Sequence, residues 1–410
     1  MKDIFIFFVF LIAAVFIHST ISTAQWFLQN SGTSNYLTSV HFIDQNSGWI
    51  VGTQGIILNT TNGGTNWTTQ TTWPVMSLRS VCFVDQNTGW VVGTDGTILK
   101  TTDGGTNWTS QTSGTNNNLY SVYFIDQNIG WTVGEVGTIL KTTNGGADWT
   151  SQTSGTSNYL SSVHFIDQNI GWVVGWNGII LKTINGGTEW ISQTSGTSST
   201  LFSVQFTDQN TGWAVGIIGT ILKTTIGGTN WTFQSIGISN DLYSVYFIDQ
   251  DNGWVVGWSC PIFNTTNGGA NWTSQTSGTN YTLQSVYFID QSTGWAVGDS
   301  GTIMKTTNGG ATFVEEEKLN EIPKEFLLMQ NYPNPFNPTT KIRYSVPQSS
   351  NVIIKMFDIL GNEIETLVNE EKPVGTYEIT WNAANLPSGI YLYKMQAGSY
   401  VEMKKMVLMK

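Results

Sequence analysis

Three carboxylates are the first candidates for chemistry in this chain. Asp95, Glu135 and Asp299 each lie in a variable two-residue segment of a sequence repeat. Other copies of the repeat carry Thr, Trp or Ile in this segment. A carboxylic acid paired with a carboxylate can cleave a glycosidic bond, so a polysaccharide-active glycosidase or lyase is one alternative. The repeat does not fix the separation of these groups and no other feature supports the pairing. We therefore expect a protein that is not an enzyme.

The sequence contains too few of the residues that other catalytic and metal-binding sites require. Beyond residue 24 the only histidines are His41 and His164, at the same place in the first and fourth repeats, which disfavours a histidine triad or metal site. Arg79 is the only arginine between residues 25 and 313, whereas a sialidase holds its substrate carboxylate with several. The Gly-Gly turns join strands and do not open helices, so they are not phosphate loops. We expect no catalytic residue, no metal and no cofactor.

Seven aspartates open Asp-Gln turns at a spacing of 41 residues: Asp44, Asp85, Asp126, Asp167, Asp208, Asp249 and Asp290. Such short carboxylates accept hydrogen bonds from backbone N–H groups in turns, and we prefer this role. The alternative, a calcium loop, would need more oxygen ligands than the turn offers. Lysines recur at a nearby strand end, where we predict partly exposed ion pairs with these aspartates: Lys100, Lys141, Lys182, Lys223 and Lys305.

The same 41-residue period is marked by Gly-Trp pairs at Trp49, Trp90, Trp131, Trp172, Trp213, Trp254 and Trp295. Each unit contains four short alternating segments separated by turns, which is the size of one propeller blade. Trp26–Thr33 matches the fourth strand of a later unit, Trp108–Thr115. The sequence thus predicts an all-β chain with a seven-bladed β-propeller at residues 25–313, its N-terminal strand closing the last blade. The repeated Trp residues are then structural, buried between blades.

The N-terminal stretch and the charge balance indicate export and exclude some partners. Residues 1–24 read as a signal peptide, with small residues before a cleavage site after Ala24 and an apolar run too short to cross a bilayer. No transmembrane segment is expected after cleavage. Residues 25–313 hold 6 Lys+Arg against 15 Asp+Glu, a balance of −9, which argues against nucleic acid and anionic membranes. Cys82 and Cys260 lie in different repeats and are expected to be free thiols.

Variation between copies indicates where recognition would occur. Alternate loops of a propeller share a face, and one set of loops is uniform while the other varies. On this second face we predict apolar anchors and polar selectors for a ligand, as aromatic side chains contribute large contact area. The anchors are Trp73, Trp176, Ile217, Ile218 and Trp258, and the selectors are Asp95, Glu135 and Asp299. The alternative is that these loops have drifted without constraint.

Two family resemblances extend this reading. Thr101–Trp108 resembles the Asp-box of sialidase-type (BNR-type) propellers, and the blade consensus over residues 25–313 resembles the photosystem II stability and assembly factor family. That resemblance implies a seven-bladed, non-enzymatic propeller that holds a protein client. The basic groove of that family is not reproduced, since Arg79 stands alone.

Residues 326–410 resemble the type A C-terminal sorting domain of the type IX secretion system. The motif residues are Tyr332, Pro333, Asn334, Pro335, Phe336, Gly361, Gly389, Lys404, Lys405 and Lys410. Taken by itself the segment predicts a small Ig-like β-sandwich with strands at Lys341–Val346, Val352–Phe357, Thr376–Trp381 and Gly389–Met395. Residues 314–325 read as the linker and cleavage region. The resemblance implies passage through the periplasm and across the outer membrane of a Gram-negative bacterium by the type IX machinery, followed by release or surface attachment.

The sequence therefore predicts an exported, monomeric, non-enzymatic binding or scaffold propeller. Its partner would be a surface protein or a polysaccharide recognised through the variable loops. Besides the glycosidase or lyase, an assembly factor for an envelope protein complex remains an alternative.

Overall fold

The computed structural model describes residues 26–70, 76–259, 261–310, 323, 325–332 and 334–409. The predicted signal peptide, most of the predicted linker, and Trp73, Cys260, Pro333 and Lys410 lie outside the described residues. The chain divides into two compact units between residues 313 and 314, and each is described by itself.

The N-terminal unit consists of seven four-stranded antiparallel sheets, which we call blades I to VII. Blade I holds β2 (Leu37–Phe42), β3 (Gly48–Gly52), β4 (Ile57–Thr60) and β5 (Thr68–Gln70). Blade II holds β6 (Leu78–Phe83), β7 (Gly89–Gly93), β8 (Ile98–Thr101) and β9 (Thr109–Gln111). Blade III holds β10 (Leu119–Phe124), β11 (Gly130–Gly134), β12 (Ile139–Thr142) and β13 (Thr150–Gln152). Blade IV holds β14 (Leu160–Phe165), β15 (Gly171–Gly175), β16 (Ile180–Thr183) and β17 (Ile191–Gln193).

Blade V holds β18 (Leu201–Phe206), β19 (Gly212–Gly216), β20 (Ile221–Thr224) and β21 (Thr232–Gln234). Blade VI holds β22 (Leu242–Phe247), β23 (Gly253–Gly257), β24 (Ile262–Thr265) and β25 (Thr273–Gln275). Blade VII holds β26 (Leu283–Phe288), β27 (Gly294–Gly298), β28 (Ile303–Thr306) and β1 (Phe27–Gln29). Short 3-10 turns follow the second strand in four blades: η1 (Thr53–Gly55), η2 (Glu135–Gly137), η3 (Trp176–Gly178) and η4 (Asp299–Gly301).

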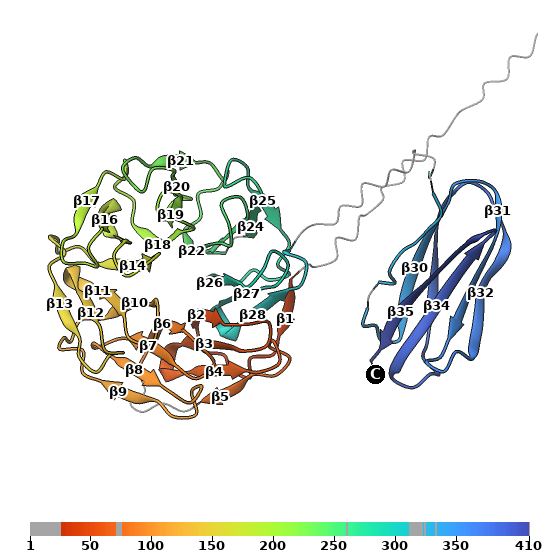
Figure 1. Ribbon diagram of the computed structural model, residues 1–410, viewed down its shortest axis with the longest axis horizontal. Coiled ribbons are helices and arrows are strands. Elements are labelled where there is room, and N and C mark those ends of the chain that lie inside the picture. The colour runs from red at the N-terminus through yellow and green to blue at the C-terminus, as the bar shows by residue number, and fades with distance from the viewer. Residues whose placement is uncertain are drawn as a thin grey trace, which may run out of the picture. The chain divides into compact units, whose positions relative to one another are not determined.

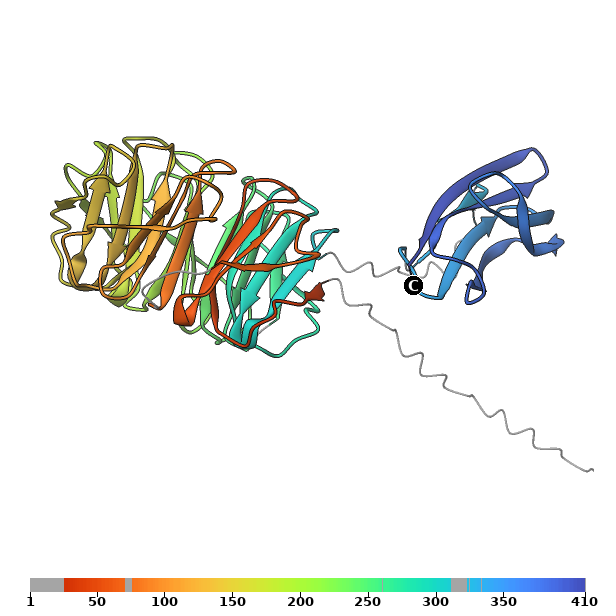
Figure 2. The same cartoon turned by 90° about the horizontal axis from the view of Figure 1, so that it is seen from below.

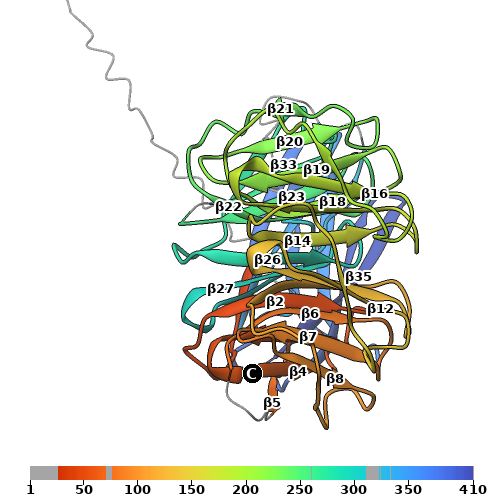
Figure 3. The same ribbon diagram turned by 90° about the vertical axis from the view of Figure 1, so that its left-hand side faces the viewer.

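The blades form a closed ring, with the first strand of each nearest the axis and the fourth at the rim (Figure 1). Figures 2 and 3 turn the same ring, so that its blades are seen from other sides. β1 pairs antiparallel with β28, with Phe27 opposite Lys305, so the first strand of the chain completes the last blade. The predicted seven-bladed propeller and its N-terminal closure are confirmed.

Stacked aromatic rings hold neighbouring blades together. Trp131 of blade III lies parallel to Phe165 of blade IV with centroids 3.5 Å apart, and its indole N–H donates to Gly186 O at 3.2 Å. The same stacking recurs around the ring at 3.5 to 3.6 Å, including Trp295 on Phe42 where the ring closes. Each blade is apolar on both sheet faces, so it needs a neighbour on either side to bury them. The repeated Trp residues are thus structural, as predicted.

The repeated aspartates cap their turns as expected. Asp85 Oδ1 accepts N–H bonds from Asn87 and Thr88 at 2.7 Å each, and its other oxygen accepts from Gln127 of blade III at 2.8 Å. Burial by itself would raise the pKa of Asp85, but these hydrogen bonds lower it below its usual value. The carboxylate therefore joins two blades and fixes one turn.

The predicted lysine–aspartate ion pairs are wrong. Lys141 Nζ lies 5.2 Å from the centroid of the Trp131 ring and donates to Gly186 O at 2.9 Å. Lys182, Lys223 and Lys305 repeat both contacts in their blades, and Lys100 repeats the ring contact. Within the described part of the propeller no ion pair joins a lysine to an aspartate. The lysine ammonium thus contacts an indole face and a backbone carbonyl oxygen instead of the predicted carboxylate.

The C-terminal unit is a two-sheet β-sandwich. One sheet has the order β29 (Leu327–Leu328), β30 (Thr339–Val346), β33 (Gly375–Asn382), and the other β32 (Glu363–Lys372), β31 (Ser350–Phe357), β34 (Gly389–Ala397), β35 (Tyr400–Leu408). The four predicted strands lie within β30, β31, β33 and β34. The sequence reading missed β32 and β35, because glutamates and lysines alternate there with apolar residues on a half-exposed face.

Several sorting-motif residues contact the terminal strand β35 of this sandwich, and Lys404 and Lys405 lie within that strand. Phe336 is buried in the core, its N–H donates to Val407 O at 2.9 Å, and Asn334 Oδ1 accepts from Val407 N at 2.8 Å. Pro335 stands between them, Tyr332 bridges to β30, Gly361 closes the turn after β31, and Gly389 opens β34. Lys404 pairs with Glu402 at 3.0 Å, and Lys405 O accepts from Gln330. The Asn-Pro-Phe motif and the terminal strand are thus one structural unit.

Candidate binding face

The loops of the propeller separate into two faces. The Asp-Gln and Gly-Gly turns are joined by backbone bonds such as Gly104 N to Asn87 O at 2.9 Å, and we call their side the turn face. The loop after each second strand is joined instead to the residue before each first strand, as Glu135 N donates to Asn118 O at 3.0 Å. We call this side the variable face. The predicted division of the loops is therefore observed.

All seven loops after the second strands share one backbone shape. The second loop residue has a left-handed φ in every blade, at Gln54, Asp95, Val136, Asn177, Ile218, Ser259 and Ser300, with values between 45° and 58°. The glycine that follows is required where it appears: a Cβ on Gly137 would lie 2.0 Å from Thr156 O. Left-handed geometry is unfavourable for β-branched residues, so Val136 and Ile218 are strained. These two loops hold apolar side chains despite a local cost.

Blades III to VI present one exposed apolar side chain each on this face. The exposed fractions are 57% for Val136, 46% for Trp176, 65% for Ile218 and 56% for Trp258. We call these four residues the apolar arc; Ile217 lies half-buried beside it. The corresponding loops of blades VII, I and II carry Asp299-Ser300, Thr53-Gln54 and Thr94-Asp95. The loops after the second strands are therefore apolar in four consecutive blades and polar in the other three, although Tyr36 of blade I and Tyr281 of blade VII, which precede the first strands, are also exposed on this face.

A second set of residues, one per first strand, repeats this division nearer the axis. Blades III to VI carry Tyr120, Ser161, Phe202 and Tyr243, and blades VII, I and II carry Gln284, Thr38 and Arg79. We call these seven residues the inner ring. Phe202 and Tyr243 lie edge to face, with centroids 5.2 Å apart. Three of the four inner-ring residues on the apolar side are aromatic, and none on the polar side is.

Glu135 is held by neighbouring donors. Its Oε1 accepts from the Tyr120 hydroxyl at 2.8 Å and from Asn118 Nδ2 at 2.9 Å, and its Oε2 accepts from Asn118 N at 3.2 Å. Burial would raise the pKa of Glu135, but these hydrogen bonds and the nearby Arg79 charge lower it. Burial and the Glu135 contact raise the pKa of Tyr120 to about 12. Glu135 is thus an ionised brace, which disfavours its use as a general acid.

Aromatic contacts extend from this brace to the arc. The Tyr120 and Tyr159 centroids lie 6.3 Å apart, and those of Tyr159 and Trp176 lie 4.5 Å apart at 41°. Each ring is therefore positioned by the next, from a hydrogen-bonded carboxylate in blade III to an exposed indole in blade IV. Aromatic surface that is fixed before binding loses little side-chain entropy when a ligand arrives.

Three further carboxylates lie on this face, Asp95, Asp241 and Asp299. Asp95 N donates to Asn118 Oδ1 at 3.0 Å, which places Asp95 beside the Glu135 network, and its carboxylate makes no hydrogen bond or ion pair with any described residue. Within the arc, Asp241 Oδ1 accepts from Ile218 N at 2.9 Å, and in blade VII Asp299 Oδ1 accepts from Gln284 at 3.4 Å. The structure thus brings Asp95 and Glu135 together but keeps Asp299 in blade VII, separate from them in the fold.

A second ring of side chains lies further along the first strands, at His41, Cys82, Tyr123, His164, Gln205, Tyr246 and Tyr287. The His41 and Tyr287 rings are tilted at 34° with centroids 4.8 Å apart, and the His164 and Tyr123 rings at 54° with centroids 4.9 Å apart. Burial lowers the pKa of both histidines to about 4 and raises that of the free Cys82 thiol to about 11. Within the described residues no three His, Cys, Asp or Glu side chains converge as metal ligands.

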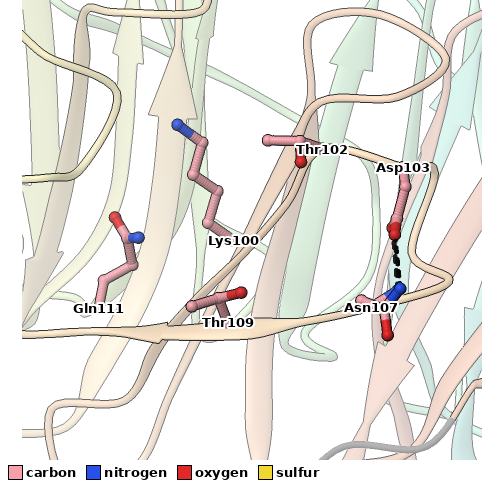
Figure 4. Close-up of a pocket in the computed structure, with 6 residues that line it drawn as sticks. All are labelled: Lys100, Thr102, Asp103, Asn107, Thr109 and Gln111. Carbon is pink, nitrogen blue, oxygen red and sulfur yellow. Dashed lines mark hydrogen bonds between the residues drawn. The ribbon is translucent and has the colours of Figure 1, made fainter.

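The concave features are shallow and polar. A pocket of about 220 Å³ on blade II is lined by Lys100, Thr102, Asp103, Asn107, Thr109 and Gln111, and Asp103 accepts from Asn107 within it (Figure 4). Its residues recur in most blades, so it is a feature of the repeat. A second pocket of about 310 Å³ lies beside the arc and includes Ser259 and Asn280. Neither holds a pair of carboxylates.

Sequence comparisons identify relatives of both units. Residues 18–110, 72–153, 108–195 and 191–277 match the family model described as photosynthesis system II assembly factor YCF48, and residues 330–409 match that of the secretion system C-terminal sorting domain. No functionally curated protein matches the sequence significantly.

Solved structures share the fold. YCF48 bound to a D1 peptide is 20% identical with a TM-score of 0.61, over 70% of this chain and 96% of that one. YCF48 from Cyanidioschyzon merolae is also 20% identical, with a TM-score of 0.60 over 69% and 98% of the two chains. PorZ of Porphyromonas gingivalis is 12% identical with a TM-score of 0.50, over 91% of this chain and 59% of that one.

Proposed function

Because the chain belongs to the family of the photosynthesis system II assembly factor YCF48, we propose that it is a non-enzymatic binding propeller that recognises a macromolecular partner, a protein or a glycan. The C-terminal sorting domain directs it to the type IX secretion system, and we propose that it acts at the outer cell surface or after release. The described residues include no helix that is long and apolar enough to cross a membrane. We assign residues 1–24 to a signal peptide and 314–325 to the linker.

The observation that carries this proposal is the apolar arc on the variable face. Four consecutive blades each expose one apolar side chain in the two-residue loop after the second strand, Trp176 and Trp258 at its first position and Val136 and Ile218 at its second. Trp176 and Trp258 can serve as central anchors, because buried aromatic residues dominate the energy of many interfaces. Ile217 and Ile218 add apolar area between them, while Asp95 and Asp299 remain as polar selectors and Glu135 positions Tyr120.

The relatives support the same kind of function. One solved YCF48 structure is described as bound to a D1 peptide, so a propeller of this family can hold a polypeptide. PorZ is described as an essential bacterial surface component of the type IX secretion system, which supports a surface role for a propeller of this kind. The lowered pKa of Glu135 and the separation of Asp299 weigh against the glycosidase or lyase alternative.

Chemical cross-linking on intact producing cells tests the proposal. The native chain is compared with a Trp176→Ala/Trp258→Ala variant and with Ile191→Thr, which changes an exposed apolar residue on the rim strand β17 to the residue found there in blade II. We expect cross-linked partners with the native chain and Ile191→Thr, and their loss with the arc variant. Identical cross-linking by all three proteins would exclude the variable face as the binding surface.

A further inference from the structure

The charge and the apolar side chains of the variable face are arranged in a way that selects one class of partner. This inference rests on the proposed function and deepens it. The apolar arc spans blades III to VI, and one carboxylate lies beyond each end, Asp95 at blade II and Asp299 at blade VII. Glu135 and Asp241 lie within the arc, Glu135 beside Val136 and Asp241 in contact with Ile218 and Trp258. Arg79 is the only propeller arginine, and its charge acts on Glu135.

We propose that the arc binds a polypeptide segment whose apolar residues are flanked by lysines or arginines. The apolar side chains of such a segment would cover Val136, Trp176, Ile218 and Trp258. Its basic ends would meet Asp95 at one end of the arc and Asp299 at the other. Unlike Glu135, which already accepts three hydrogen bonds, Asp95 has no partner among the described residues and Asp299 has only a long contact to Gln284.

Backbone strain at the arc is an independent reason to assign it a function. Val136 and Ile218 have φ values of 52° and 56°, in a region that β-branched residues rarely adopt. The same loop position holds Asn177 in blade IV and Asp95 in blade II, residue types that tolerate this geometry. Strained residues persist chiefly where a function requires the side chain. Both strained residues are exposed apolar members of the arc.

A glycan fits the arc less well than a polypeptide does. Sugar rings stack on flat aromatic faces, and two of the four arc residues are aliphatic. Sugar recognition also needs polar side chains that are free to bond hydroxyl groups beside the aromatic ring. Glu135, which is linked to the Tyr159–Trp176 pair through Tyr120, already has its carboxylate occupied by Tyr120 and Asn118.

Fluorescence anisotropy with the full chain tests this assignment. The probe is a labelled peptide of about twelve residues, long enough to extend over roughly 40 Å, with Leu and Trp between Lys pairs. Two control peptides replace Lys by Glu or the apolar residues by Ser. We expect measurable binding of the first peptide only, weakened by raising the ionic strength from about 0.05 to about 0.5 M.

Variants then locate the site. Ile218→Asn relieves strain and removes an anchor, so its lost binding cannot be ascribed to a damaged fold; we expect Kd to rise about tenfold, and similarly for Trp258→Ala. Asp95→Asn with Asp299→Asn should remove most of the salt dependence. Ile191→Thr on the rim should bind like the native chain.

Three outcomes would overturn the proposal. The first is equal binding of the Lys and Glu peptides, the second is binding unchanged in Ile218→Asn, and the third is no binding of the Lys peptide. Binding of a cellohexaose or chitohexaose probe that is lost in Trp176→Ala would replace the polypeptide by a glycan and leave the proposed binding function intact. That function fails separately, in the cross-linking experiment on cells.

Discussion

The turn face and the variable face of the propeller are built from the same strands, yet one is uniform and the other is not. On the turn face, side chains find their partners in the next blade, as Asp85 does with Gln127 and Trp131 with Gly186. On the variable face, the loops are joined to the sheet by backbone groups, as Trp176 N is to Tyr159 O. Backbone hydrogen bonds form whatever the side chain is, so the loop side chains on this face can differ from blade to blade while the ring stays closed.

The largest test of this difference compares two tryptophans. Trp131→Ala removes a fully buried indole that stacks on Phe165 and bonds Gly186, and should lower the free energy of propeller unfolding by about 3–5 kcal/mol. Trp176→Ala on the variable face should cost less than about 1 kcal/mol, because the side chain is nearly half exposed. Urea unfolding followed by circular dichroism measures both. Equal losses would show that the variable face also supports the ring.

The two histidines between the faces should make stability depend on pH. Burial lowers the pKa of His41 and His164 from 6.5 to about 4, so between these values the unfolded chain binds more protons than the folded chain. The contribution of these histidines to the free energy of unfolding is therefore fully present above about pH 6.5. It falls as the pH drops toward 4, by at most about 3 kcal/mol per histidine. Calorimetric melting across this range measures the loss.

His164→Tyr provides the control for that titration, because Tyr123 occupies the same place in the next blade. We expect the variant to lose about half of the pH dependence below pH 6.5 while it keeps its ring contact. A slope identical to that of the native chain would assign the acid sensitivity to other groups.

The smallest effect concerns the strained loops. Ile218→Asn should raise the unfolding free energy by about 1 kcal/mol, since Asn tolerates left-handed φ and the Ile218 side chain is 65% exposed. The reciprocal Asn177→Ile should lower it by a similar amount. Thermal melting of the two variants beside the native chain decides this, and a destabilised Ile218→Asn would mean that the side chain contributes packing that outweighs its strain.

Most of the fold was predictable because it is repeated. The 41-residue spacing of the Gly-Trp pairs, with the four alternating segments between them, predicts the blades, and the match of Trp26–Thr33 to Trp108–Thr115 predicts the closing strand. β32 and β35 of the sandwich were missed because charged residues interrupt their alternation. The lysine ion pairs were predicted wrongly because chain spacing cannot distinguish a carboxylate from an indole face as the nearest group.

The candidate site was predictable only in part. Copy-to-copy variation pointed to Trp176, Ile217, Ile218, Trp258, Asp95, Glu135 and Asp299, whose placement on one face the structure describes, whereas Trp73 falls outside the described residues. Val136 and the inner ring were missed. The inner-ring position does vary from repeat to repeat, whereas its neighbours, such as Leu119 and Ser121, are the same in every repeat. The sequence predicted Glu135 as a polar selector, and the structure places Tyr120 and Asn118 on its carboxylate.

By itself the sequence determined the architecture and the presence of a sorting domain, because a strict period and a contiguous sorting motif are local signals. Only the tertiary structure decided how the differing residues combine. The packing of consecutive blades sets blades III to VI beside one another, so single exposed residues about one repeat apart become one arc, and the pairing of β10 with β11 brings Asn118 and Tyr120 onto Glu135. The physical reason is that neighbours on the face are distant in the chain, and their contacts depend on side-chain directions that the packing of the blades fixes.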